Sequence, residues 1–205
     1  MKSLATFFLI TILFSFVACK QEKETVPKST PNINQEKVNS HESETPKSID
    51  LTSKLEEKIT RLATLEHHYQ VKSIDVVLPE KTVLLWRLQH ALTLKDSLAT
   101  IADLTKIKSN IHEVRTSFLK GTKPMRPNGT TYPRVTIEEY IFNTPESAKT
   151  AFNILMESKK NVGLWTYVSK SPNALFVEEN RMYFIDSGGY YMMEIYSYIT
   201  EKIKN

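Results

Sequence analysis

The sequence predicts an α+β domain over residues 51–205, with N-terminal helices followed by a small, mainly antiparallel sheet that has helices on one face. Between residues 51 and 121, apolar side chains recur every three or four positions, which is the period of a helix. After Gly121 the apolar segments become short, rich in β-branched and aromatic residues, and separated by turn residues, which is typical of strands. The expected order is helices, then β-α-β-β-β-α.

The helical half is predicted from two apolar stripes. The first stripe consists of Leu55, Ile59, Leu62, Leu65 and Tyr69. An extended piece is expected at residues 73–78, before Pro79, and helices then resume at residue 83 and continue to Gly121. The second stripe consists of Val83, Leu85, Trp86, Leu88, Leu92, Ile101, Leu104, Ile111, Val114 and Phe118. Asp96 or Ser97 would cap a break within it.

The second half is predicted mainly from strand signals. "RVTIEEYIF", residues 134–142, alternates apolar and polar side chains and predicts a strand. Thr144 followed by Pro145 predicts a helix start, and Gly163 lies just past the expected end of that helix. Three further strands are expected in "LWTYVSK" (164–170), "ALFVEE" (174–179) and "RMYFID" (181–186), and a C-terminal helix is expected over residues 192–203.

Residues 1–18, "MKSLATFFLITILFSFVA", have the composition of a secretory signal peptide. Lys2 supplies the positive start, and an apolar stretch of about fifteen residues follows from Leu4 to Ala18. That stretch is shorter than the ~20 residues that a helix needs to cross the hydrocarbon core of a membrane. A permanent membrane helix, oriented by Lys2 alone, is the alternative.

Cys19 is the only cysteine, which excludes an intramolecular disulfide. Together with the preceding residues it forms "FVAC", which resembles the lipobox of bacterial lipoproteins, with Phe16 in place of the usual Leu. The resemblance implies that Cys19 receives a diacylglycerol thioether, that the signal is cleaved before it, and that its amino group is acylated, for example with palmitate. Two or three acyl chains give stable anchoring, whereas one is marginal. A cysteine that merely follows a signal peptide is the alternative.

Residues 19–50 are predicted to be the lipidated cysteine and a disordered tether. Residues 20–50 contain three prolines, no aromatic residue and no glycine, so they cannot bury enough apolar surface to offset their ordering entropy. The chain is therefore expected in the bacterial cell envelope. Lys20 stands in place of the Asp that retains many enterobacterial lipoproteins in the inner membrane, so the resemblance implies the outer membrane rather than the inner one. "KQEKE", residues 20–24, resembles an export tag of surface lipoproteins, or it is simply the solvated start of the tether.

The candidate partner-binding residues surround a loop rich in proline and glycine. They are Lys120, Lys123, Arg126, Tyr132 and Arg134. Such a loop could hold a phosphate or an acidic protein surface, and solvated loop charges are the alternative. The net charge of +4 is too mild to predict nucleic-acid binding.

No catalytic residue, metal site or cofactor is predicted. "DSGG", residues 186–189, resembles the nucleophile motif of chymotrypsin-like serine proteases, but Ile185 and Tyr190 depart from its flanks. Glu138 and Glu139 are neighbours on a strand and should face opposite sides, which is wrong for a pair of catalytic carboxylates. We therefore expect a non-catalytic binding domain, such as an inhibitor or immunity-type protein. A small envelope hydrolase, or a structural accessory of an envelope complex, is the alternative.

Overall fold

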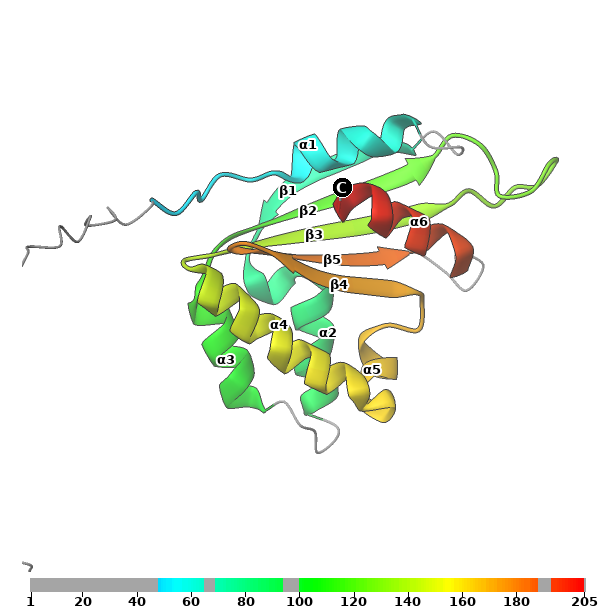
Figure 1. Cartoon of the computed structure of the whole chain (residues 1–205). Coiled ribbons are helices and arrows are strands. Elements are labelled where there is room, and N and C mark those ends of the chain that lie inside the picture. Colours follow the sequence, from blue (N-terminus) through cyan, green and yellow to red (C-terminus); the bar gives the residue numbers. More distant parts are fainter. Residues whose placement is uncertain (1–47, 65–68, 94–99, 188–192, 205) are drawn as a thin grey trace, which may run out of the picture. The chain divides into compact units, whose positions relative to one another are not determined.

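The central element is a five-stranded antiparallel sheet with the strand order β1-β2-β3-β5-β4 (Figure 1). A computed structural model describes residues 48–64, 69–93, 100–187 and 193–204, which all belong to one compact unit, Thr45–Asn205. The strands are β1 (Tyr69–Val77), β2 (Ile111–Gly121), β3 (Arg134–Phe142), β4 (Asn173–Glu178) and β5 (Arg181–Ser187). The predicted α+β class with an antiparallel sheet is therefore confirmed. The predicted signal peptide, Cys19, nearly all of the tether, Leu65 and the two glycines of "DSGG" lie outside the described residues.

Helices cover both faces of the sheet, so the prediction of helices on one face is wrong (Figure 1). One face packs against α1 (Leu55–Thr60) and α6 (Met193–Lys204). The other packs against α2 (Val83–Leu92), α3 (Ile101–Ser109), α4 (Pro145–Lys160) and α5 (Val162–Val168). Short 3₁₀ helices, η1 (Arg61–Thr64) and η2 (Pro79–Lys81), follow α1 and β1.

The strand β5 explains why both faces are covered. All seven of its residues are buried, because alternate side chains enter different cores. Met182 and Phe184 join the core under α2–α5, whereas Tyr183 and Ile185 join the core under α1 and α6. Its residues 182–185 form an uninterrupted apolar run, which is typical of a strand that is buried on both faces.

Residues 111–121 were predicted as helix and form the strand β2 instead. Val114 and Leu119 lie five positions apart and enter opposite cores, which a strand achieves and a single helix face does not. Hydrogen-bonded ladders with β1 on one side and β3 on the other satisfy the backbone of this segment. The strand β1 also takes in Tyr69, which was assigned to the first helical stripe, and overlaps the predicted extended piece at 73–78.

Residues 164–168 were predicted as strand and form the helix α5 instead. The Asn161 side chain accepts a hydrogen bond from the Leu164 amide at 3.1 Å and so begins this helix. Leu164, Trp165 and Val168 are spaced at the helical period and are all buried. Gly163 is consequently the second residue of α5. The strands β3, β4 and β5 and the helix α4, capped by Thr144, were predicted correctly.

Candidate functional site

On the sheet face covered by α2–α5, three cross-strand neighbours on β2, β3 and β5 form a row. In the strand register Phe118 lies opposite Thr136, and Thr136 lies opposite Asp186. Directly opposed residues of antiparallel strands point to the same face, so these side chains are neighbours. Phe118 is 37% exposed, which means that the helices leave this end of the sheet face uncovered.

Three of the five predicted binding residues come together beside that row. Lys120 pairs with Arg134 in the register of β2 and β3, one step beyond Phe118 on the same face. The Lys120 ammonium lies 5.0 Å from the centre of the Tyr132 ring, a cation–π arrangement. We call Phe118, Lys120, Tyr132, Arg134 and Thr136 the basic strip.

The other two predicted residues, Lys123 and Arg126, are exposed in the connection between β2 and β3, which extends beyond the sheet (Figure 1). Internal hydrogen bonds order this connection: the Met125 amide donates to the Thr131 carbonyl at 2.9 Å, and the Gly129 amide donates to the Arg126 carbonyl at 2.9 Å. Asn128 adopts a positive φ of 62° in the turn of residues 126–129, which the second of these hydrogen bonds closes. Arg126 therefore lies within a turn that has its own hydrogen bonds, and Lys123 lies just before that turn.

Next to the basic strip, the structure forms an ionic cluster that the sequence did not predict. Arg87 of α2 contacts Asp186 of β5, with Nη1 and Oδ2 3.1 Å apart, and the Ser169 hydroxyl donates to the other carboxylate oxygen at 2.9 Å. Burial raises the pKa of Asp186, and the Ser169 and Arg87 hydrogen bonds oppose that rise. Arg87 and Asp186 are 99 positions apart, so no local pattern could have paired them.

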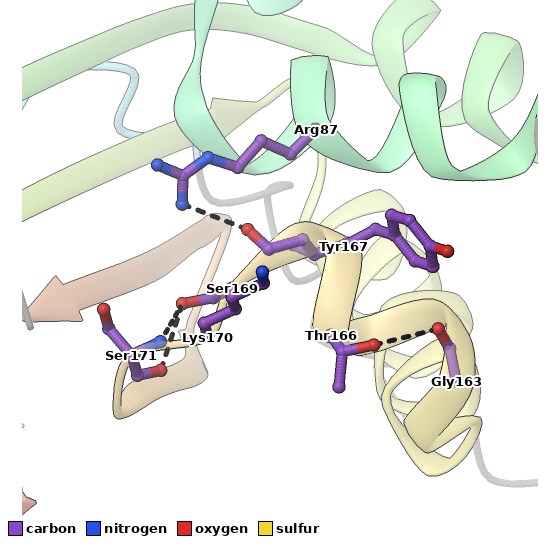
Figure 2. Close-up of a pocket in the computed structure, with 8 residues that line it drawn as sticks. Arg87, Gly163, Thr166, Tyr167, Ser169, Lys170 and Ser171 are labelled. Carbon is purple, nitrogen blue, oxygen red and sulfur yellow. Dashed lines mark hydrogen bonds between the residues drawn. The ribbon is translucent and has the colours of Figure 1, made fainter. Parts of the chain in front are cut away.

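A cavity of about 600 Å³ opens beside this cluster, between α2 and residues 163–171 (Figure 2). It is lined by Arg87 on one side and by Thr166, Tyr167, Ser169, Lys170 and Ser171 on the other. We call this cavity the Arg87 pocket.

Ser187, the candidate nucleophile of the "DSGG" segment, is fully buried. Its hydroxyl donates to the Pro172 carbonyl at 2.7 Å, which fixes the end of β5 to the start of β4. The adjacent Asp186 faces Arg87 and Ser169 instead. His90 stacks on Trp86, with ring centres 4.8 Å apart on the exposed side of α2. The hydrogen bond to the Pro172 carbonyl therefore gives Ser187 a structural role.

Glu138 and Glu139 are both buried and lie on opposite faces of β3, as predicted. Glu138 accepts hydrogen bonds from the Val83 and Leu84 amides, at the first turn of α2, and from the Tyr140 hydroxyl at 2.7 Å. An acceptor here satisfies amides that a helix N-terminus leaves unpaired. Both carboxylate oxygens of Glu138 are therefore engaged in holding α2 on the sheet.

The pH dependence of Glu138 is testable. Burial raises its pKa above the ordinary value of 4.5, against the opposing hydrogen bonds from Tyr140 and the α2 amides. Because the folded pKa is the higher one, the stabilisation from this group is fully present below about pH 4.5 and is lost as the pH rises through the folded pKa. Glu138→Gln, which has no titration, should gain stability relative to the wild type as the pH rises. Urea unfolding of both proteins between about pH 4 and pH 8 measures this difference.

Glu80→Gln is the matched control, because Glu80 is exposed and lies just before α2. The free energy of unfolding of Glu138→Gln should therefore rise relative to that of Glu80→Gln as the pH rises. A difference between the two variants that stays constant with pH would contradict the buried, raised-pKa carboxylate.

Comparisons with protein-family models, curated proteins and solved structures find no match for this chain. The fold and site thus define the class by themselves: an α+β domain with a basic, partly aromatic sheet face and an arginine-lined pocket. Among the described helices, none has both the length and the apolar character needed to cross a membrane. Over the same residues, no cluster of three or more histidine, cysteine, aspartate or glutamate side chains could hold a metal ion.

Proposed function

We propose that this chain is an envelope lipoprotein, lipidated at Cys19, whose domain is a non-catalytic binding module for an acidic segment of a protein partner. The lipid anchor rests on the lipobox resemblance and on the composition of residues 1–50. The binding surface is the basic strip, extended by Lys123 and Arg126.

The observation that supports this function is a pair of partly exposed aromatic residues on a surface that also carries cations. Phe118 and Tyr132 are 37% and 36% exposed, and Lys120 and Arg134 lie beside them. Lys120, Lys123, Arg126 and Arg134 make no ion pair with any residue that the structure describes. Aromatic residues beside cations without an ion pair match the common anatomy of an interface, in which aromatic anchors are buried and charges select the partner.

Binding is favoured over hydrolysis because the buried acids are already occupied. Glu138 and Asp186 share one sheet face and both have raised pKa values, as a pair of catalytic carboxylates would. Glu138, however, is buried under α2, and Asp186 is held by Arg87 and Ser169. Neither carboxylate is left free to act on a substrate, which supports a role in folding.

Site-specific photo-crosslinking in cells tests the proposal. A photo-reactive phenylalanine analogue replaces Phe118 in the full chain, and mass spectrometry identifies what it captures. Val162 is the matched control, since it is 73% exposed, begins α5 and is not part of the basic strip. We expect one discrete protein product from position 118 and none from position 162. Equal products from both positions would contradict the proposed interface.

Charge reversal tests the contribution of the loop. The double variant K123E/R126E, combined with the analogue at position 118, should lower the crosslinked yield about tenfold, because like charges oppose an acidic partner. The variant K149E/K202E changes the net charge equally at two exposed positions on α4 and α6 and should leave the yield unchanged. An undiminished yield for K123E/R126E would rule the loop out of the interface.

A further inference from the structure

Arg87 has a hydrogen-bonding edge that no described residue uses. Its Nη1 donates to Asp186 at 3.1 Å and to the Val168 carbonyl at 3.0 Å, which accounts for both hydrogens of that nitrogen. Within the described part of the chain, no residue accepts a hydrogen bond from its Nε or Nη2. The Ser169 hydroxyl donates to the other oxygen of Asp186 at 2.9 Å, so the acceptor is itself fixed. The guanidinium is therefore held in one orientation before any ligand arrives.

The unused edge of Arg87 does not face the Arg87 pocket. Figure 2 shows the guanidinium extending from α2 toward the strands, with Nη1 turned to residues 163–171 and the Nε and Nη2 edge turned away from them. Asp186, which holds the guanidinium, lies two strands from Phe118 in the row Phe118–Thr136–Asp186. Neighbouring strands are about 4.8 Å apart, so Arg87 reaches the sheet on the order of 10 Å from Phe118. Arg87 therefore lies at the β5 end of this row.

The side chain between Arg87 and Phe118 is also polar and unused. Thr136 is half-buried, and its hydroxyl makes no hydrogen bond with any residue that the structure describes. The Arg87 side chain is 37% exposed, so a ligand on this face can reach it. An arginine fork, a hydroxyl group and an aromatic ring thus follow one another along one sheet face. This arrangement is complementary to a carboxylate that stands near an apolar side chain.

We infer that Arg87 is a further contact of the basic strip and binds a carboxylate of the acidic partner segment through Nε and Nη2. The planar fork of these two nitrogens matches the two carboxylate oxygens. Lys120 and Arg134 lie one step beyond Phe118, so they hold a second acidic group on the order of 10 Å from the first. The inference rests on the proposed function and adds a pattern to it: two acidic groups with an apolar side chain between them, which packs on Phe118.

Nuclear magnetic resonance of the full chain in mild detergent tests this contact directly. The probe is the acetylated and amidated pentapeptide Glu-Gly-Leu-Gly-Glu, whose carboxylates can span on the order of 10 Å, and Gln-Gly-Leu-Gly-Gln is its neutral control. We expect the acidic probe to shift the Nε–H resonance of Arg87 and the ring resonances of Phe118 saturably, and the neutral probe to shift neither. Arg115 is the reference arginine, because its Nε already donates to Glu113 at 2.7 Å, and its resonance should not move.

Two variants extend the test. Arg87→Lys keeps a cation beside Asp186 but removes the fork, so it should weaken binding of the acidic probe, followed at Phe118, about tenfold. Lys149→Glu changes an exposed charge on α4 and should bind the probe as the wild type does. The resonance shift of Arg87 is measured on the wild type, so the test does not depend on how well Arg87→Lys folds.

The outcomes that overturn the inference are distinct from failure of the proposed function. Saturation at Phe118 with no shift at Arg87 excludes Arg87 from the interface and leaves the basic strip in place. Absence of saturation with the acidic probe, or equal binding of both peptides, excludes the pattern of two acidic groups. Failure of the proposed function is a separate result, in which position 118 captures no protein in cells.

Discussion

Replacing Arg181 by alanine should lower the free energy of unfolding by about 3–5 kcal/mol, the usual cost of removing one partner from a buried ion pair. Arg181 is only 2% exposed and lies beside the fully buried Glu139, with Nε and Oε1 3.8 Å apart. Its Nη2 also donates to the Thr52 carbonyl at 2.6 Å and to the Asp50 carbonyl at 3.0 Å. The substitution would leave Glu139 without its cation and these carbonyls without a donor.

Arg181, Glu139 and Asn180 form a cluster whose hydrogen bonds hold residues 50–54 on the sheet. Glu139 accepts hydrogen bonds from the Ser53 hydroxyl and the Lys54 amide, and Asn180 donates to the Asp50 carbonyl at 2.9 Å. The Thr52 hydroxyl and amide, followed by the charge of Arg181, lower the pKa of Asp50 to about 2. Because the predicted tether ends at Asp50, this cluster is where the domain would bear any pull from a lipid anchor.

Urea unfolding of the full chain, followed by tryptophan fluorescence, measures the effect of Arg181→Ala. Arg115→Ala is the matched control, because Arg115 forms a partly exposed pair with Glu113 and should cost no more than about 1 kcal/mol. The double variant R181M/E139Q, which removes both charges together, should be more stable than Arg181→Ala. A loss below about 1 kcal/mol for Arg181→Ala would contradict the role of the cluster.

Replacing Cys19 by serine should abolish lipid attachment completely. If Cys19 carries two or three acyl chains, each buried CH₂ contributes about 0.8 kcal/mol to membrane binding, so loss of all of them should release the protein from the membrane fraction. Metabolic labelling with an alkyne fatty acid measures attachment, and ultracentrifugation measures release.

The control for Cys19→Ser restores a thiol elsewhere. In the double variant C19S/S40C the chain again has one cysteine, now within the predicted tether and far from the lipobox. It should stay unlabelled, because the expected modification depends on the residues that precede the cysteine. Labelling of either variant would refute lipidation at Cys19.

The strands and helices that were predicted correctly are those with strong local signals. Thr144 and Pro145 begin α4 by capping and fixed backbone geometry, and β3 alternates apolar and polar side chains along its length. These features act over a few residues, so the sequence alone was sufficient. Lys120 and Arg134 were predicted as part of a basic loop rich in proline and glycine, and the structure places them on the paired ends of β2 and β3.

Tertiary structure decided the rest, because the deciding contacts join residues far apart in the chain. Residues 111–121 have apolar spacing compatible with a helix, and only pairing with both β1 and β3 makes them a strand. Burial against α2 makes residues 164–168 a helix in spite of their strand-like composition.

The buried ion pairs are also features that only the tertiary structure decided. Arg87 meets Asp186, and Arg181 meets Glu139 and residues 50–54, only after the sheet has assembled. The sequence by itself determined the fold class, most of the second half and the residues at which an anchor and a basic loop are expected. Only the tertiary structure placed a buried charge opposite its partner, because that pairing is set by strand register and helix packing and by no local pattern.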